Sequence, residues 1–258
     1  MTDQSLGVVI PAYRPDTELL ERYVDRIDDR LDPETVLIEL DAPESETVDE
    51  LRSLPVVINT VPHRRGKGAA ITAGFERLET DLLLFADADG STPVDSLAEI
   101  VAPVRNDQAA LAVGSRRHPE AEIDDEQSVL RQTLGDGFSW LAGSLLSVTL
   151  YDYQCGAKAI DADAWEQLHT HLYEAGFAWD VEVIAMAGAF ELPVAEIPVE
   201  WEDRPGSTVD PVADSTRMFR ALVTSRHRAK QLDDDRLHSA IAARKTEPTP
   251  LIERGQEL

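Results

Sequence analysis

The chain has 258 residues and 43% of them are hydrophobic, which fits one large globular domain or two smaller ones. Its formal net charge is -25, with 49 acidic against 24 basic residues, and this charge excludes a nucleic-acid-binding role because it repels phosphate backbones. The single cysteine, Cys155, excludes an internal disulfide.

Charge and hydropathy also predict where the protein works. Only four lysines occur, so arginine carries nearly all of the positive charge. Strong self-repulsion is tolerable in molar salt, where the Debye length falls to about 3 Å, and we therefore expect a halophilic protein. The N-terminus has no basic and apolar leader, and the longest mostly apolar stretch, residues 137–151, is shorter than the roughly 20 residues that span a bilayer. We expect a cytoplasmic protein, at most peripheral on the cytoplasmic face of a membrane.

The first 115 residues alternate between short apolar runs and amphipathic segments. The apolar runs predict strands at residues 6–11, 35–40, 56–61, 82–87 and 110–115. The segments between them predict a helix capped by Asp16 and helices at residues 44–54, 66–78 and 94–104. This alternation is typical of βαβ units, so the predicted fold class is α/β, with a mainly parallel central sheet flanked by helices.

The pattern changes after residue 118. Residues 128–150 predict a helix that is interrupted by Gly135 and Gly137 and is almost wholly apolar in its second half. Residues 214–230 predict a basic amphipathic helix, and the polar residues 231–258 are expected to be loosely ordered. The remaining expected elements are strands at residues 155–160 and 192–199 and helices at residues 162–173 and 179–187.

The strongest single pattern is the end of the fourth predicted strand, where four apolar residues run into Asp87-Ala88-Asp89-Gly90. At a strand end followed by a turn, both carboxylates can converge just beyond the sheet edge at which open α/β sheets bind ligands. Two carboxylates there suit Mg²⁺ or Mn²⁺, with positions left for phosphate oxygens. The alternative is an Asx-turn with one helix-capping aspartate.

A cationic, glycine-containing loop, His-Arg-Arg-Gly-Lys-Gly at residues 63–68, lies between a predicted strand and a predicted helix. Such a helix N-terminus favours anions, so Gly66 and Lys67 are candidates to bind a diphosphate beside the two aspartates. The alternative is an ordinary solvated loop whose glycines allow tight packing. No G-x-G-x-x-G follows the first strand, and no Walker A motif occurs.

Further candidate phosphate ligands are spread along the second half. Arg116 follows a predicted strand and Arg131 lies early in the apolar helix, and either guanidinium could clamp a phosphate bidentately. Arg204 and Ser207 lie in a predicted turn and can also bind phosphate. For each of the four, a surface or turn residue without a role is the alternative. Cys155 has no histidine nearby in the sequence, which favours a buried structural thiol over a nucleophile.

Two acidic segments complete the set of candidates. In the segment from Asp152 to Lys158, an acid, a glycine and one of the rare lysines lie close together. Asp180 and Glu182 are spaced i, i+2 on a predicted helix, so they point in different directions and at most one of them faces a site. For the other, the alternative is a first-turn acid that favours the helix dipole.

The chain resembles the inverting, GT-A fold glycosyltransferases of family 2 in eight motifs that follow the same order: VVIPAYRP, LDAP, RRGKGAA, FADADGS, GSR, DYQCGAK, WDVEV and EIPVEW…RPGS. The resemblance covers roughly residues 6–208 and is strongest for the polyprenyl-phosphate (dolichyl-phosphate) glucosyl- and mannosyltransferases. The DADGS and Gln-Cys-Gly-x-Lys forms are more similar to the glucosyltransferase branch. The resemblance implies a Rossmann-like GT-A domain at residues 1–210, followed by the basic helix and polar tail at residues 211–258.

The resemblance also implies roles for single residues. Those expected around the nucleotide are Pro11, Ala12, Tyr13 and Asp41 at the base and ribose, Gly66 and Lys67 near the base or diphosphate, and Asp87 and Asp89 at the diphosphate through Mg²⁺ or Mn²⁺. Those expected around the reacting groups are Arg116 and Arg131 at the acceptor phosphate and Asp152, Gln154 and Asp180 at the sugar. The expected catalytic set is Asp89, Arg116, Arg131 and Asp180.

The chain departs from the family pattern at three places. Arg14-Pro15 replaces an acidic residue that usually follows the first tyrosine, and Asp41-Ala42-Pro43 stands for a longer Asp-Asp-Gly-Ser. The second of these changes puts the base contacts there in doubt. Gly135 stands where a serine is common, which removes one phosphate ligand.

We therefore predict a metal-dependent, inverting transfer of a hexose, glucose from UDP-glucose, to a polyprenyl or dolichyl phosphate, for glycan assembly or protein glycosylation. A phosphate acceptor is largely ionised at neutral pH and needs cations more than a base. The alternatives are GDP-mannose as donor, a sugar-hydroxyl acceptor with Asp180 or Glu182 as base, a nucleotidyltransferase, and a non-catalytic nucleotide-sugar-binding protein. A lipid acceptor would also explain the apolar residues 138–150 and the basic helix as surfaces that contact a membrane. The alternative for residues 138–150, which we prefer, is an ordinary core helix, and the alternative for the basic helix is packing against the acidic domain.

Overall fold

The protein is described by a computed structural model that covers residues 4–123, 129–201, 211–232 and 249–254. Its central sheet has seven strands in the order β3-β2-β1-β4-β7-β5-β8, and a second sheet pairs β6 with β9. Strand β7 runs antiparallel to β4 and β5, and the other neighbours in the large sheet are parallel. The predicted α/β class with a mainly parallel sheet is confirmed. The strands are β1 (Leu6–Ala12), β2 (Thr35–Asp41), β3 (Val57–Val61), β4 (Leu82–Ala86), β5 (Leu111–Ser115), β6 (Glu122–Ile123), β7 (Ala157–Asp161), β8 (Val194–Pro198) and β9 (Glu200–Trp201).

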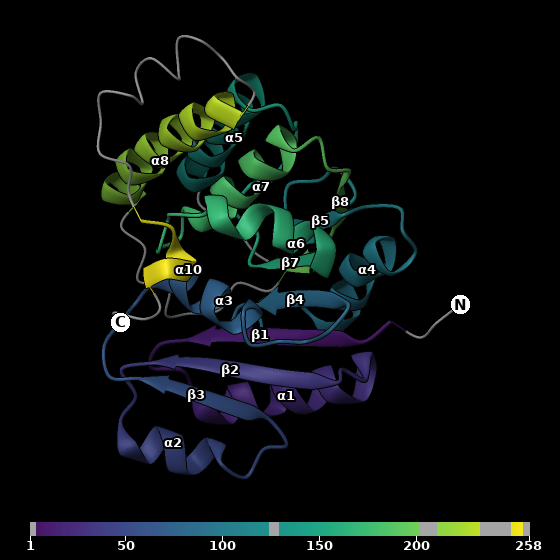
Figure 1. Ribbon diagram of the computed structural model, residues 1–258, viewed down its shortest axis with the longest axis vertical. Coiled ribbons are helices and arrows are strands. Elements are labelled where there is room, and N and C mark those ends of the chain that lie inside the picture. The colour runs from purple at the N-terminus through teal and green to yellow at the C-terminus, as the bar shows by residue number, and fades with distance from the viewer. Residues whose placement is uncertain (1–3, 124–128, 202–210, 233–248, 255–258) are drawn as a thin grey trace.

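Helices cover both faces of the large sheet (Figure 1). One face packs on α1 (Thr17–Leu31), α2 (Ser45–Leu51) and α4 (Val94–Arg105). The core on the opposite face includes residues of α3 (Lys67–Phe75), α6 (Ala162–Leu168) and α7 (Trp179–Ala189), and α8 (Pro211–Leu232) packs on α7 and on α5 (Val129–Leu145). Strands β4 and β5 are buried along their whole length because both faces are covered, which explains why they read as continuous apolar runs.

Local sequence explains where the first helices begin. The Asp16 carboxylate accepts a hydrogen bond from the Leu19 N–H at 3.0 Å, so the predicted N-cap is confirmed. In α1 the residues Leu20, Tyr23, Val24 and Ile27 are buried at helical spacing. Helix α3 begins at Lys67 directly after Gly66, whose φ of 103° belongs to the region that favours glycine.

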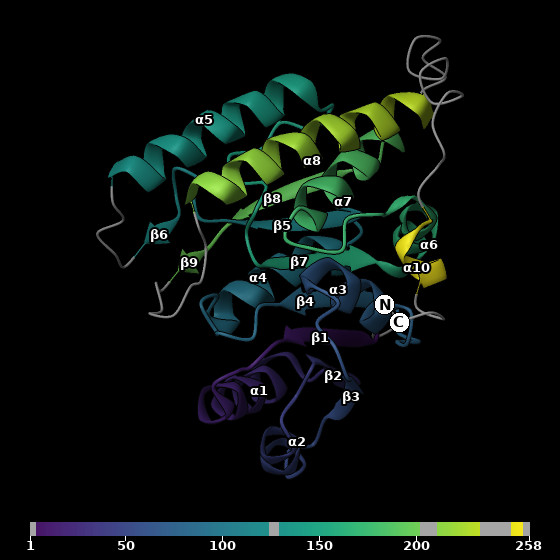
Figure 2. The ribbon, with the colours of Figure 1, turned by 90° about the vertical axis from the view of Figure 1, so that its left-hand side faces the viewer.

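The predicted interruption of the apolar helix is wrong, because α5 continues through Gly135 and Gly137. A side chain at residue 135 would lie 1.7 Å from Arg117 Nη2, so the glycine leaves room for an arginine that pairs with Asp136. The helix keeps its hydrogen bonds at a cost of about 1 kcal/mol for a glycine. Helices α5 and α8 run side by side along one face of the molecule (Figure 2).

The end of the chain also differs from expectation. Residues 251–254 form a short helix, α10 (Leu251–Arg254), next to the 3₁₀ turn η1 (His169–His171). The Leu251 N–H donates to the Leu172 carbonyl oxygen at 2.8 Å, and its side chain is buried. These residues are therefore packed rather than loosely ordered, and residues 233–248 lie outside the described part. Among the described helices, none combines the length and the apolar character that crossing a bilayer requires.

Candidate functional site

The candidate residues meet at one edge of the large sheet. Strands β1, β2, β4 and β5 all point their carboxyl ends to this edge because their ladder is parallel, and antiparallel β7 begins there. The chain therefore places Tyr13, Asp41, Asp87 and Arg116 at or just after the strand ends, and Gly156 just before β7. This is the edge at which doubly wound sheets bind ligands.

Asp87 and Asp89 differ in how they are held. The Asp87 N–H donates to the Gly156 carbonyl oxygen at 2.9 Å, and its Oδ1 lies 2.9 Å from Lys67 Nζ. Asp89 Oδ1 accepts a hydrogen bond from the Ser91 N–H at 2.9 Å, which is the Asx-turn contact of the alternative interpretation. The turn continues through Gly90, with a φ of 63°.

These two carboxylates fit a hard divalent cation by their chemistry. Asp89 is exposed and the Asp87 side chain is 37% exposed, so a cation can reach both. Within the described residues, no group of three or more His, Cys, Asp or Glu side chains forms a complete ligand set. A cation held here would therefore take most of its ligands from phosphate oxygens or water, as Mg²⁺ does in phosphate-binding sites.

Behind Asp87, four charged side chains form a chain that we call the lysine–aspartate relay: Asp87, Lys67, Asp180 and Lys158. Lys67 Nζ lies 2.9 Å from Asp87 Oδ1 and 3.3 Å from Asp180 Oδ2. Lys158 binds the other oxygen of Asp180 and donates to the Cys155 carbonyl oxygen at 2.8 Å. Side chains of Lys158 and Asp180 are at most 3% exposed, so each charge is compensated inside the protein.

The relay sets the ionisation of its members. Burial alone would lower the pKa of Lys67, but the carboxylates of Asp180 and Asp87 outweigh it and raise that pKa above its ordinary value. Desolvation raises the pKa of Asp87, as do the charges of Asp89 and Asp180, while Lys67 opposes them. Lys67 thus stays protonated, with its ammonium group between the carboxylates of Asp87 and Asp180.

Arg116 forms a second cluster with Asp152 at the end of β5. Its Nε donates to Asp152 Oδ2 at 2.7 Å, and its Nη2 donates to Oδ1 at 3.1 Å. The Gln154 N–H donates to the same carboxylate at 2.9 Å. Burial would raise the pKa of Asp152, but Arg116 and the Gln154 N–H outweigh it and hold that pKa at about 2. Arg116, Asp152 and Gln154 are therefore brought together, with a quarter of the Arg116 side chain exposed.

Asp41 holds the cationic loop rather than standing alone. Its carboxylate accepts hydrogen bonds from the Arg65 N–H at 2.7 Å, from Arg65 Nε at 2.7 Å and from the Gly66 N–H at 3.1 Å. Arg65 also binds buried Glu39, so its side chain is not available to an anion. Arg64 instead lies over the ring of Tyr13, with its guanidinium carbon 4.3 Å from the ring centre.

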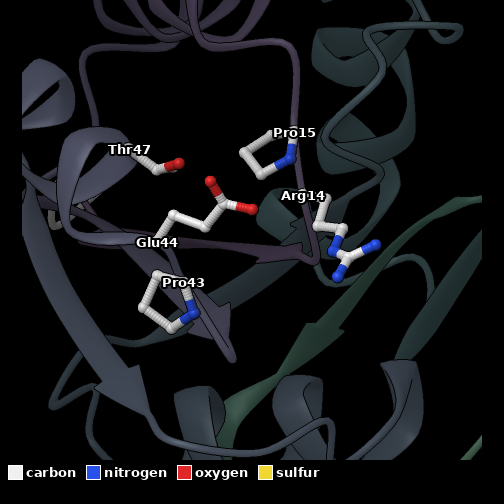
Figure 3. A pocket seen from close by; sticks show the side chains of 5 residues that line it. All are labelled: Arg14, Pro15, Pro43, Glu44 and Thr47. Atoms are coloured by element: carbon white, nitrogen blue, oxygen red, sulfur yellow. The ribbon is translucent and has the colours of Figure 1, made fainter.

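The first two departures from the family pattern, at Arg14-Pro15 and at Asp41-Ala42-Pro43, lie beside one hollow on the surface. It has a volume of about 300 Å³ and is lined by residues from the loops that follow β1 and β2. Figure 3 shows the Glu44 carboxylate pointing between Thr47 and Pro15, with Arg14 beside it. Arg14 has a φ of 50° and Ala42 a φ of 45°, and each precedes a proline. Arg14 and Pro15, which line the hollow, directly follow the predicted nucleotide-binding residues Pro11–Tyr13 in the sequence.

The two acids of α7 point apart, as predicted. Asp180 joins the lysine–aspartate relay, whereas Glu182 accepts hydrogen bonds from the Tyr173 and Glu174 N–H groups at 2.7 Å each and binds Arg228 of α8. Glu182 is fully buried, and its carboxylate is bound to these partners. The structure therefore argues against Glu182 as a catalytic base.

Three of the predicted phosphate ligands are not located by the structure. The backbone of Arg131 belongs to α5, but its side chain lies outside the described residues, as do Arg204 and Ser207. Cys155 is fully buried, and desolvation raises the pKa of its thiol to about 11. The predicted burial of this thiol is confirmed.

Sequence reasoning missed the contacts of Lys158 with Asp180 and of Gly156 with Asp87. The rarity of lysine in this chain marked Lys158, but its partner Asp180 is 22 residues away and is brought near only by packing. The Gln-Cys-Gly-x-Lys segment was the available signal for both residues.

Comparison with known proteins shows which family and which relatives the chain resembles. The family described as glycosyl transferase family 2 matches residues 7–164. Dolichyl-phosphate beta-glucosyltransferase of Homo sapiens is 29% identical over 250 residues, which cover 87% of this chain and 76% of that protein. Glycosyltransferase AglD of Haloferax volcanii is 30% identical over 224 residues, covering 81% of this chain and 35% of AglD, so the chain spans about a third of that relative.

Solved structures share the fold. Glucosyl-3-phosphoglycerate synthase from Mycobacterium tuberculosis, crystallised with Mn²⁺, UDP-glucose and phosphoglyceric acid, superposes with a TM-score of 0.68 at 14% identity, covering 87% of this chain and 80% of that one. Mannosyl-3-phosphoglycerate synthase from Rubrobacter xylanophilus gives a TM-score of 0.65 at 17% identity, covering 86% of this chain and 73% of that one. The predicted GT-A fold is confirmed.

Proposed function

Because the chain belongs to glycosyl transferase family 2, we propose that it transfers glucose from UDP-glucose to a polyprenyl or dolichyl phosphate. We also propose that the transfer inverts the anomeric carbon and requires Mg²⁺ or Mn²⁺. The product is a lipid-phosphate-linked sugar for glycan assembly or protein glycosylation. Residues 1–210 are the proposed catalytic domain, and residues 211–258 are the proposed C-terminal segment.

Relatives support the donor and the acceptor. Dolichyl-phosphate beta-glucosyltransferases from Homo sapiens, Mus musculus and Dictyostelium discoideum each align over more than four fifths of this chain. A β-linked product from an α-linked nucleotide sugar requires inversion. The Mn²⁺ and UDP-glucose of the Mycobacterium tuberculosis structure support a metal-dependent nucleotide-sugar site in this fold.

One observation carries the proposal: Asp87 and Asp89 lie at the carboxyl edge of the sheet, with Lys67 on one side and Arg116 at the end of β5, which is separated from β4 by β7. Mg²⁺ or Mn²⁺ bound to the two aspartates would neutralise charge on the leaving diphosphate. Lys67 binds the same diphosphate, because its ammonium group already lies at the edge of the site beside Asp87. Arg116 positions the acceptor phosphate with the part of its side chain that is exposed.

The acceptor explains why the site has cations rather than a free base. An oxygen of the acceptor phosphate bonds to the anomeric carbon while the bond from that carbon to the diphosphate oxygen breaks, and the electron pair leaves with UDP. A phosphate monoester needs no proton removed, because its second pKa is about 6. Both oxygens of Asp180 are bound by lysine ammonium groups, so we assign it a positioning role at the sugar pocket rather than the role of a base.

A lipid acceptor also implies contact with a membrane surface, at which we propose a peripheral position on the cytoplasmic face. Met218, Ala221 and Leu222 of α8 are buried against the fold, so these apolar residues of the basic helix do not face lipid. Exposed apolar side chains of the paired helices include Trp140 of α5, at 74% exposure, and Phe219 and Val223 of α8. These three residues are the surface that we propose for lipid contact.

The direct test is transfer of labelled sugar from UDP-glucose, and separately from GDP-mannose, into organic-extractable product, with polyprenyl phosphate, Mn²⁺ and molar KCl. We expect label in the lipid fraction from UDP-glucose, and we expect the Asp89→Asn variant to lose at least a hundredfold in rate, since it removes one cation ligand. Asp25→Asn, a matched change at an exposed aspartate of α1, should retain full activity.

Each other outcome identifies an alternative. Transfer from GDP-mannose alone would overturn the donor assignment. Transfer to a sugar hydroxyl but not to lipid phosphate would overturn the acceptor assignment and would require a base. Binding of UDP without any turnover would favour a non-catalytic nucleotide-sugar-binding protein.

A further inference from the structure

Gly156 lies opposite the end of β4, on the antiparallel strand partner of Asp87. The β4–β7 ladder pairs Ala86 with Ala157, and its next step places Gly156 beside Asp87. The Gly156 carbonyl oxygen accepts the Asp87 N–H at 2.9 Å, so the backbones of the two residues are in direct contact. This contact links the Gln-Cys-Gly-x-Lys segment to the first of the two aspartates.

The Asp87 carboxylate occupies the space that a side chain at residue 156 would need. A Cβ on Gly156 would lie 1.9 Å from Asp87 Oδ2, 2.5 Å from its Cγ and 3.2 Å from its Cβ. Backbone conformation is not the reason for the glycine, because the positive-φ glycines of the described chain are Gly66 and Gly90. The carboxylate itself therefore explains why residue 156 has no side chain.

The segment around Gly156 has no room to move away. Cys155 and Ala157 on either side are fully buried. Cys155 packs so closely on β5 that a Cβ on Gly114 would lie 2.9 Å from its Sγ. On its other side, the Asp87 carboxylate meets Lys67 Nζ at 2.9 Å. A larger residue at position 156 must therefore displace Asp87 rather than the strand, because packed interiors yield little.

From this geometry we propose that Gly156 is a positioning residue: it seats the Asp87 carboxylate where Asp87 and Asp89 can hold one divalent cation together. The inference rests on the proposed role of these aspartates in metal binding. Gly156 touches neither donor nor acceptor. Its contribution is the missing side chain, because the Asp87 carboxylate fills the space that a Cβ at residue 156 would take and can therefore adopt this rotamer.

The test is Mn²⁺ binding, measured by electron paramagnetic resonance with UDP present, in the full chain with Gly156→Ala. We expect Mn²⁺ affinity to fall by about 10- to 100-fold, as is typical when a residue that orients a metal ligand is changed. Gly137→Ala is the matched control, because within the described structure a Cβ there meets nothing within 4 Å, and its Mn²⁺ affinity should equal that of the wild type.

A double-variant cycle separates positioning from a general loss of stability. The melting temperature is measured in chelator for Gly156→Ala, Asp87→Ala and the double variant. We expect Gly156→Ala to lower the melting temperature in the wild type and to have no effect once Asp87 is alanine, because the clashing carboxylate is then gone.

The outcomes distinguish this inference from the proposed function. Wild-type protein that fails to bind Mn²⁺ with UDP would overturn the metal role of Asp87, and the positioning role of Gly156 with it. Wild-type binding with equal binding by Gly156→Ala would overturn the positioning role alone. An equal loss of melting temperature in the two backgrounds would also overturn it, because the alanine would then act on the strand and not on Asp87.

Discussion

At the scale of single residues, the site holds its charged groups in place before any ligand arrives. In the lysine–aspartate relay, Lys158 and Lys67 bind the two oxygens of Asp180, and Lys67 also reaches Asp87. In the second cluster, Arg116 is fixed by the two oxygens of Asp152. Such groups need little reorganisation when a charged substrate binds, which is the main advantage of a preorganised site.

The Arg116–Asp152 pair leads to a prediction about acid stability. Asp152 is buried, and its pKa falls from the ordinary 3.8 to about 2 because Arg116 outweighs the cost of burial. A carboxyl whose pKa is lower in the folded state stabilises the protein fully above the unfolded value and loses this contribution as the pH falls. We expect Asp152→Asn to lower the free energy of unfolding by on the order of 2 kcal/mol at pH 7.

Urea unfolding at several pH values checks this prediction. The difference between wild type and Asp152→Asn should be constant above about pH 5 and should shrink as the pH falls through the unfolded pKa of 3.8 toward the folded pKa of about 2. A difference that stayed the same at pH 3 would mean that the variant acts through packing and not through the charge pair.

At the scale of whole elements, the alternation of strands and helices in the first half of the chain was predictable, because each element there has its own local sequence pattern. Strands β1, β2 and β4 are apolar runs of five to seven residues, and α1 has helical spacing and a cap. The predicted start of β7 is two residues too early. Its first residue, Ala157, is set by pairing with Ala86 at the end of β4, and not by the residues of β7 itself. Two-residue strands such as β6 and β9 have no pattern to detect.

The residues of the candidate site also differ in whether a local sequence pattern could predict them. Asp87 and Asp89 could be found because they lie two residues apart at the end of one strand. The pairing of Lys158 with Asp180 and of Arg116 with Asp152 joins residues that are 22 and 36 positions apart, and only the packed sheet brings them together. The basic face of α8 was overestimated, because Arg228 turns inward to Glu182 and Arg226 donates to the Leu145 carbonyl oxygen.

Helix α8 supports a prediction about membrane contact. Phe219 is 51% exposed on α8, which lies next to the helix that carries Trp140. Insertion of an exposed aromatic side chain into lipid is worth about 1.5–3 kcal/mol. In flotation with anionic lipid vesicles, we expect Phe219→Asp to reduce the bound fraction about tenfold. Val57→Asp, at an equally exposed position on edge strand β3, should float like the wild type. Equal flotation of both variants would rule out this surface of α8.

At the scale of the whole molecule, the net charge of -25 is spread over a chain whose buried charges are mostly compensated. The buried acids Glu39, Asp41, Asp152, Asp180 and Glu182 each have a cationic partner within the described structure. The uncompensated negative charge therefore belongs largely to the surface, where it acts through water and dissolved ions. Repulsion of this kind opposes the compact state without being tied to any single contact.

Surface repulsion of this size predicts that salt stabilises the protein, and this prediction tests the expectation from the sequence that the protein is halophilic. The Debye length falls from about 30 Å at 0.01 M salt to about 3 Å at 1 M, so KCl should screen the surface while leaving the buried pairs unchanged. We expect the melting temperature to rise steadily with KCl, by about 2–4 °C for each kcal/mol of repulsion removed. Sucrose, which stabilises by exclusion but does not screen charge, is the control and separates the two effects. A melting temperature that was flat in KCl would show that repulsion is already relieved at low salt, and it would remove the physical argument for adaptation to a salt-rich cytoplasm.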